Sequence, residues 1–215
     1  MPRVQYKNAE GKRLPGVTTV AGAYKGSITG LMTWANRGGL DGKSLEDMYG
    51  ESTEPGSLAH LMIEDFLKGQ KTNTAGIDQV VIDLAAAAFS NWQEWFKQHE
   101  IEPIEIEPNI VSEELQVGGT PDLTATVQGK LCLIDWKTGK ASYTSNLLQL
   151  AAYDLLHQET RGVAFEGFYI IVVPRKDDIP TFSVKYFGTM PSEAYEQFRR
   201  LRACYEAEKN LKKYL

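Results

Sequence analysis

Residues 118–153, GGTPDLTATVQGKLCLIDWKTGKASYTSNLLQLAAY, contain two short apolar runs followed by a helical pattern. Apolar side chains alternate with other residues in both runs, at Leu123, Ala125, Val127, Leu131 and Leu133. Alternation with a period of two predicts a β-strand for each run. Gln128-Gly129 lies between the runs and is typical of a two-residue hairpin turn. The stretch therefore predicts an antiparallel hairpin followed by a helix.

The predicted hairpin carries two carboxylates and one ammonium group. Pairing of its strands brings Asp122 close to Asp135, and Lys137 lies on the same sheet face as Asp135. Such charges are costly to bury unless a ligand uses them, and hard divalent cations prefer oxygen ligands. We therefore expect a small open metal site formed by Asp122, Asp135 and the backbone carbonyl of Trp136. A surface Asp–Lys pair is the alternative, but it leaves the second carboxylate unexplained.

The hydrolysis of a phosphodiester bond is the chemistry that this site favours. A metal ion can acidify a bound water and polarise the phosphorus at the same time. Lys137 is placed either to hold the attacking water or to neutralise charge that develops in the transition state.

The rest of the chain predicts an α/β fold with a central mixed β-sheet flanked by helices. Helical patterns occupy residues 17–20, 31–37, 55–69, 78–99, 144–158 and 191–209, with a polar loop or frayed helix over 41–54. Strand patterns occupy residues 104–112 (interrupted at Pro108), the hairpin, 165–173 and 181–187. We expect one domain over 1–215, with a mainly helical region over 1–102 and a sheet-containing core over 103–215.

Composition limits the classes of function. The 215 residues carry a net charge of -5, so the chain is not a generally basic nucleic-acid binder. Its two cysteines, Cys132 and Cys204, cannot supply the four thiolates of an iron–sulfur cluster. Neither a signal peptide nor a run of apolar residues long enough to span a membrane is present in the sequence. The expected location is the cytoplasm.

Two pairs of polar residues with helical spacing accompany the hairpin. His60 and Glu64 lie on one face of the predicted 55–69 helix, and Gln149 and Tyr153 lie on one face of the 144–158 helix. Taken alone, each pair is more typical of partly buried structural residues. Beside a carboxylate site, His60 and Glu64 become candidates for metal binding, while Gln149 could face the metal site and Tyr153 could touch the substrate phosphate.

Four motifs follow one another along the chain: GSLAH at 56–60 with Glu64, GGTPD at 118–122, DWKTG at 135–139 and QLAAY at 149–153. In this order they resemble the PD-(D/E)XK nuclease superfamily, specifically its RecB-like exonuclease branch. A looser similarity to the mitochondrial genome maintenance exonuclease and its phage relatives extends to residues 14–20 and 31–34. The resemblance implies a restriction-endonuclease-like core.

The resemblance also implies roles for individual residues. It assigns metal binding to His60, Asp122 and Asp135, and the role of catalytic lysine to Lys137. Gln149 and Tyr153 would orient the site or contact DNA. Glu114 could match an acidic position ahead of the GGTPD motif, with Glu113 as a competing match. Some relatives carry a cysteine-ligated iron–sulfur cluster, which this chain cannot hold.

The resulting hypothesis is a Mg²⁺- or Mn²⁺-dependent DNA exonuclease that acts on single strands or DNA ends, in a bacterial or phage-infected cell. The alternatives are an endonuclease or structure-specific nuclease with the same chemistry, and a non-catalytic DNA-binding protein that kept the fold. Local positive charge must then contact the DNA away from the metal. Candidates are Lys7, Lys12 and Arg13, the Lys25–Arg37 region, Lys140, Arg175-Lys176 and Arg199-Arg200-Arg202. Solvated helix faces are the better interpretation for most of the C-terminal ones.

Overall fold

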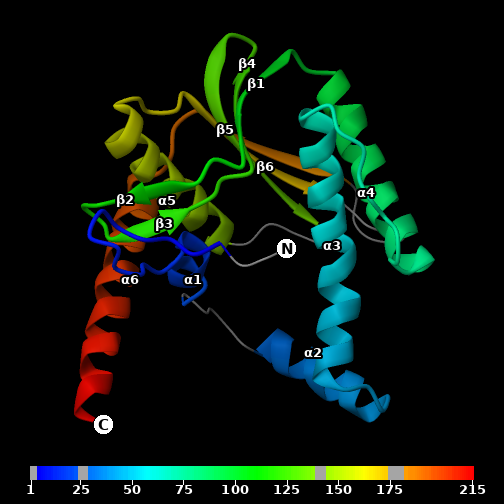
Figure 1. Cartoon of the computed structure of the whole chain (residues 1–215), viewed down its shortest axis with the longest axis horizontal. Helices are drawn as coiled ribbons and strands as arrows, with labels where there is room; N and C mark the ends of the chain where they lie inside the picture. Colours follow the sequence, from blue (N-terminus) through cyan, green and yellow to red (C-terminus); the bar gives the residue numbers. More distant parts are fainter. Residues whose placement is uncertain (1–3, 24–28, 139–143, 174–181) are drawn as a thin grey trace.

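A five-stranded β-sheet forms the centre of the chain, described by a computed structural model over residues 4–23, 29–138, 144–173 and 182–215 (Figure 1). The strand order is β1 (Ile101–Ile106), β4 (Leu123–Val127), β5 (Lys130–Thr138), β6 (Gly167–Val173) and β7 (Ser183–Phe187). Only β5 and β6 are parallel, and the other neighbours are antiparallel. The predicted mixed sheet is therefore confirmed. Lys25, Lys140 and Arg175-Lys176 lie outside the described residues.

The β4–β5 hairpin forms as its sequence predicts. Gln128 and Gly129 both have positive φ, 49° and 78°, which is the backbone conformation of a type I′ turn. The register pairs Leu123 with Ile134 and Val127 with Lys130. Asp122 therefore lies one residue beyond the last ladder pair, opposite Asp135.

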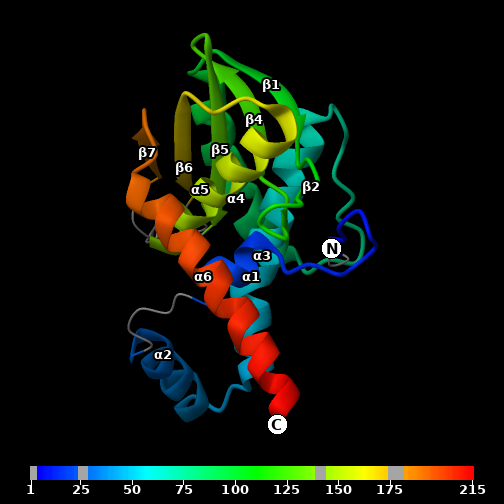
Figure 2. The same cartoon turned by 90° about the vertical axis from the view of Figure 1, so that its left-hand side faces the viewer.

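Helices cover both faces of the sheet (Figures 1 and 2). On one face α1 (Val17–Ala21), α5 (Thr144–Arg161) and α6 (Ser192–Leu211) share a core with Leu133 of β5. On the other, α3 (Leu45–Leu67) and α4 (Gln79–Lys97) pack on Ile134 and Trp136 of the same strand. The alternation along β5 thus separates two apolar cores. Within the described ranges, no helix combines the length and apolar character needed to cross a membrane.

The region ahead of the hairpin differs from the prediction of a single strand over residues 104–112. β1 starts at Ile101 and ends at Ile106, and the chain then turns at Glu107, whose φ is 48°. Pro108 follows and has no amide hydrogen for a sheet ladder. Residues Ile110–Ser112 (β2) instead pair with Val117–Gly119 (β3), a strand absent from the prediction, in a separate two-stranded sheet. This small sheet packs against α5.

The first turns of α3 also differ from the prediction. Residues 45–54, expected to form a loop or frayed helix, are part of a 23-residue helix that contains Pro55. The Ser44 side chain caps this helix by accepting a hydrogen bond from the Asp47 backbone amide. This capping position starts the helix ten residues before the apolar pattern becomes clear.

Two smaller expectations for the N-terminal helices are wrong. The helix predicted over 31–37, α2 (Thr29–Leu40), runs through Gly38-Gly39 and does not end there. Gly38 is buried, and a Cβ at this position would lie 2.0 Å from the sulfur of Met48 in α3. The hydroxyl residues of the predicted 17–20 helix also suggest a side-chain cap for α1, but Gly16 occupies the capping position and no side-chain hydrogen bond is made there.

Candidate active site

Asp122 is fixed at the open end of the β4–β5 hairpin. Its Oδ2 accepts a 2.9 Å hydrogen bond from the backbone amide of Trp136. The carboxylate therefore takes the place of a backbone acceptor just beyond the last ladder pair, Leu123–Ile134. This bond sets the position of Asp122 relative to β5.

Asp135 and Lys137 form a buried ion pair beside it. The Asp135 side chain is 0% exposed, and Lys137 Nζ donates a 2.8 Å hydrogen bond to its Oδ1. The same Nζ lies 2.7 Å from Oδ2, an oxygen that has no hydrogen-bond partner among the described atoms. Asp122 lies close enough to both residues to affect their titration. The structure thus brings together the three predicted residues of the hairpin.

The electrostatics of the pair are those of charge held away from water. Burial raises the pKa of Asp122 and of Asp135 to about 6 each, although the Lys137 ammonium opposes this shift. Burial acts to lower the pKa of Lys137, but the two carboxylates outweigh it and raise that pKa above its ordinary value. Lys137 therefore stays protonated near neutral pH.

His60 of α3 approaches Asp122 at Oδ1, whereas the Trp136 amide binds Oδ2. Its Nδ1 lies 3.7 Å from Asp122 Oδ1, and its ring centroid lies 5.9 Å from that of Trp136. A quarter of the side chain stays exposed. Desolvation and then the charge of Lys137 lower the pKa of His60 to about 4, although Asp135 and a hydrogen bond with the Trp136 backbone oppose this. At pH 7 the imidazole is neutral and can act as a ligand.

A glycine allows α3 to approach the end of β5. A Cβ on Gly56, the first residue of GSLAH, would lie 2.4 Å from Oγ1 of Thr138. With any larger residue here, either the Thr138 side chain or the helix would have to shift. The glycine of this motif therefore has a packing reason, and His60 follows one helical turn later on the same face.

Gln149 and Tyr153 of α5 contact each other. Gln149 Nε2 donates a 2.8 Å hydrogen bond to the hydroxyl of Tyr153, and both side chains are buried. The Tyr153 ring packs on Gly119 of β3, where a Cβ would lie 2.6 Å from Cε1. Burial and then the charge of Asp135 raise the pKa of Tyr153 well above its ordinary value. Its phenol therefore stays neutral beside the carboxylates.

Of the remaining acidic candidates, Glu64 lies near the site and Glu114 does not. Glu64 pairs with Lys68 on α3 and hydrogen-bonds Glu107. Glu114 lies in the exposed turn between β2 and β3, where its amide donates to Glu159 of α5, and it does not join the other site residues. The acidic residue that sequence reasoning missed is Glu107. Its amide donates a 3.1 Å hydrogen bond to the carbonyl of Asp122.

We expect Glu107→Gln to reduce the pH dependence of stability in metal-free buffer. Burial and then the charges of Glu64 and Asp122 raise the pKa of Glu107 from 4.5 to about 7. Between these values the folded protein holds a proton that the unfolded chain has released, so the unfolding free energy falls as pH rises. The variant loses this part of the decline.

Urea denaturation at pH 5 and pH 8 with EDTA measures the effect of Glu107→Gln. The unfolding free energy of the variant minus that of the unmodified protein should be larger at pH 8 than at pH 5. Glu114→Gln, at an exposed position, is the matched control and should give the same difference at both values. Equal behaviour of the two variants would contradict the assigned environment of Glu107.

The donor atoms at the hairpin fit a hard divalent cation in kind. The two carboxylates are ligands that such a cation prefers, whereas the neutral imidazole is a nitrogen ligand that suits transition-metal ions. Asp135 Oδ2 is a buried acceptor without a hydrogen bond, although it lies 2.7 Å from Lys137 Nζ. As placed, no three acidic, histidine or cysteine side chains of the described residues converge on one point. Instead, the ammonium group of Lys137 supplies the positive charge beside Asp135.

Comparison with known families decides which fold this is. The family model described as the PD-(D/E)XK nuclease superfamily matches residues 37–210. The chain belongs to the PD-(D/E)XK nuclease superfamily. The mixed sheet with its flanking helices is accordingly a restriction-endonuclease-like α/β fold, and members of this superfamily generally use divalent metal ions. No curated protein sequence matches the chain.

Two solved structures are similar to this chain at low sequence identity. A "putative exonuclease" from Eubacterium rectale has a TM-score of 0.52 at 9% identity, and the match covers 72% of this chain but only 65% of that protein. The structure of LHK-Exo in complex with dAMP gives a TM-score of 0.42 at 10% identity, covering 73% of this chain and 79% of the other.

Proposed function

We propose that this nuclease is a divalent-metal-dependent DNA exonuclease that acts on single strands or DNA ends. The observation that carries the proposal is the convergence of Asp122, Asp135 and Lys137 at one end of the β4–β5 hairpin. Burying such charges is unfavourable, and a module that only binds DNA has no need of them. The RecB-like exonuclease branch stays a prediction from the sequence motifs.

His60, Asp122, Asp135 and the backbone carbonyl of Trp136 are the groups that would hold the cation. These groups lie near the open end of the β4–β5 hairpin. His60 Nδ1 is 3.7 Å from Asp122 Oδ1, and the Trp136 amide donates a hydrogen bond to the Asp122 carboxylate. A cation bound there would supply Lewis acidity at the scissile phosphate. Trp136 also supports His60, because its buried indole packs against the imidazole ring.

Lys137 is the group proposed to act on the reacting atoms. Asp135 holds its Nζ, and the remaining N–H bonds can orient a water molecule or donate to a non-bridging phosphate oxygen. The water oxygen forms a bond to phosphorus while the bond to the leaving sugar oxygen breaks. That oxygen leaves as a hydroxyl after it takes up a proton, and the proton lost by the water passes to solvent.

Gln149 and Tyr153 are proposed to position the substrate. Their mutual hydrogen bond fixes the Tyr153 hydroxyl on the face of the sheet that carries Asp135. A neutral phenol can donate a hydrogen bond to a phosphate oxygen without adding negative charge. The support for exonuclease rather than endonuclease action is the motif resemblance together with the description of the Eubacterium rectale neighbour.

Cleavage assays on defined DNA test the proposal. Purified protein with Mg²⁺ or Mn²⁺ should shorten end-labelled linear DNA, leave closed circular single strands intact and lose activity in EDTA. Lys137→Ala should lower the rate by about 10²–10⁴-fold, since it removes a group that assists proton or charge transfer. Cutting of circles would indicate the endonuclease alternative. Inactivity on every DNA form would overturn the proposal.

Calorimetric titration with Mn²⁺ tests the proposed ligands separately from cleavage. The unmodified protein should bind Mn²⁺ at the hairpin, and Asp122→Asn should remove or strongly weaken that site because it removes a carboxylate ligand. Glu114→Gln is the control, since the structure places Glu114 away from the hairpin. Equal binding by both variants would contradict the ligand assignment and favour a non-catalytic protein.

A further inference from the structure

Residues 6–14 form a small β-ladder near the N-terminus, called here the N-terminal hairpin. Leu14 donates a 2.9 Å backbone hydrogen bond to Tyr6, and Asn8 donates one of 3.0 Å to Lys12. Lys7 and Arg13 form an antiparallel bridge between them. The alternation places Tyr6, Asn8 and Leu14 toward the protein, where Leu14 and Asn8 are buried. Lys7 and Arg13 face outward and are exposed.

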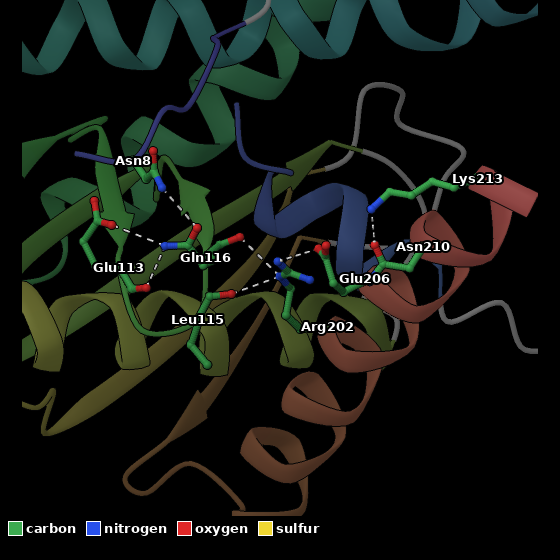
Figure 3. A network of polar contacts seen from close by, with 8 residues as sticks. All are labelled: Asn8, Glu113, Leu115, Gln116, Arg202, Glu206, Asn210 and Lys213. Atoms are coloured by element: carbon green, nitrogen blue, oxygen red, sulfur yellow. Dashed lines mark hydrogen bonds and ion pairs between the residues drawn. The ribbon is translucent and has the colours of Figure 1, made fainter. Parts of the chain in front are cut away.

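Side-chain hydrogen bonds attach the N-terminal hairpin to the β2–β3 sheet. Asn8 Nδ2 donates to Gln116 Oε1 at 3.2 Å, and Ala9 N donates to Glu113 Oε1 at 2.7 Å. Figure 3 shows that Arg202 of α6 donates hydrogen bonds to the carbonyls of Leu115 and Gln116, in the turn between β2 and β3. These contacts join segments about a hundred residues apart in the sequence, so the hairpin has a defined place.

That place is beside the candidate active site. The hydroxyl of Tyr6 lies 3.0 Å from Oγ1 of Thr120, two residues before Asp122. The Tyr6 ring covers Gly118, where a Cβ would lie 2.1 Å from Cγ. Tyr6 is also near enough to Tyr153 to contribute to its electrostatic environment. The inner face of the hairpin thus packs on the GGTPD segment, and Lys7 and Arg13 lie on its opposite, exposed face.

The outward face presents two positive charges in direct opposition. Cross-strand partners lie within about 5.5 Å at Cβ, and like charges at such positions repel. Neither Lys7 nor Arg13 has a carboxylate partner within 4.0 Å in the part of the chain that the structure describes. With Lys12 and Glu10, the hairpin carries three cations and one anion in a chain of net charge -5. An anion bound between them would relieve the repulsion.

We propose that Lys7 and Arg13 bind the phosphodiester backbone of the DNA strand that enters the site. The inference rests on the proposed function, because the hairpin borders the residues assigned to cleavage. Phosphate groups are the ligands that fit, because two neighbouring exposed cations can neutralise the charges of adjacent phosphates. Such contacts do not reach the edges of the bases. The contact is therefore independent of sequence and holds the strand for cleavage without taking part in it.

Salt-dependent DNA binding tests the inference. The variants Lys7→Gln/Arg13→Gln and Lys97→Gln/Lys130→Gln remove the same charge, and the second pair lies exposed at the opposite end of the sheet. Each is combined with Lys137→Ala and titrated, with Mg²⁺ present, against a fluorescent 25-nucleotide single strand. The hairpin variant should weaken binding about tenfold and reduce the salt slope by about 1.4, whereas the control pair should change neither.

Cleavage kinetics and a charge-retaining variant complete the test. In the otherwise unmodified enzyme, Lys7→Gln/Arg13→Gln should raise KM for DNA and leave kcat unchanged. Lys7→Arg/Arg13→Lys should bind like the unmodified protein and so excludes a folding defect. Equal weakening by both glutamine pairs, or by neither, would overturn the inference while cleavage stands. If the unmodified protein neither binds nor cuts DNA, the proposed function itself fails.

Discussion

Asp135→Asn is expected to lower DNA hydrolysis on the order of 10³-fold or more, because it removes both a carboxylate of the proposed metal site and the anchor of Lys137. The same change should alter the stability of the metal-free protein in a pH-dependent way. Burial raises the Asp135 pKa from 3.8 to about 6, so the folded carboxyl is protonated near pH 5 and charged at pH 8. Asparagine removes this cost only where the carboxylate is ionised.

Two measurements therefore separate a functional carboxylate from a structural one. In EDTA, the unfolding free energy of Asp135→Asn minus that of the unmodified protein should be greater at pH 8 than at pH 5. Asp154→Asn is the matched control. Asp154 is equally buried but accepts hydrogen bonds from Gln158, the Phe165 amide and Tyr195, so its replacement should destabilise the fold and spare kcat. Substantial hydrolysis by Asp135→Asn would reject the proposed role.

The second large effect is expected at Trp136, which links the core to the site. Its side chain is fully buried and contacts both the Trp92 ring, at 5.7 Å between centroids, and His60. Trp136→Ala should destabilise the protein by about 3–5 kcal/mol, as expected for removal of a buried aromatic ring. It should also lower kcat at a temperature where the variant is folded, because His60 loses its support.

Trp92→Ala provides the comparison for Trp136→Ala. Trp92 lies in the same core, is equally buried and packs on Phe66, Phe96 and Trp136, and among the described residues no ring contact joins it to His60. Chemical denaturation should give similar losses for both alanine variants, and kinetics should show the loss of kcat for Trp136→Ala alone. Should Trp136→Ala not fold, Trp136→Phe should keep the fold with a smaller loss of kcat. Equal kcat values for Trp136→Phe and the unmodified protein would reject a supporting role.

The parts of the fold that local sequence determines were predictable. The I′ turn at Gln128-Gly129 sets the register of β4 and β5, and that register alone brings Asp122 opposite Asp135. β6 could be predicted as a strand covered on both faces because its apolar residues are contiguous. The structure confirms this, since Ile170 and Ile171 belong to opposite cores.

The parts that depend on distant contacts were not predictable. Glu107 lies beside Asp122 only because the chain reverses after β1, with a positive φ that glutamate rarely adopts. Residues 45–54 carry no clear apolar stripe, and their helix is specified by the Ser44 cap and by the packing of Met48 on Gly38. β3 is short and glycine-rich, so its pairing becomes evident only once Tyr6 and Tyr153 are seen against it.

Pro55 divides α3 into two parts with separate local stabilities. It has no amide proton, so the carbonyl four residues earlier lacks its helical partner. The turns after Pro55 hold Leu58, Ala59 and Ile63 in the core, whereas the turns before it bury Met48 against α2. Amide hydrogen exchange before Pro55 should therefore report local opening, and exchange around His60 should approach the rate of global unfolding. The part of α3 before Pro55 can therefore open locally without displacing the imidazole of His60.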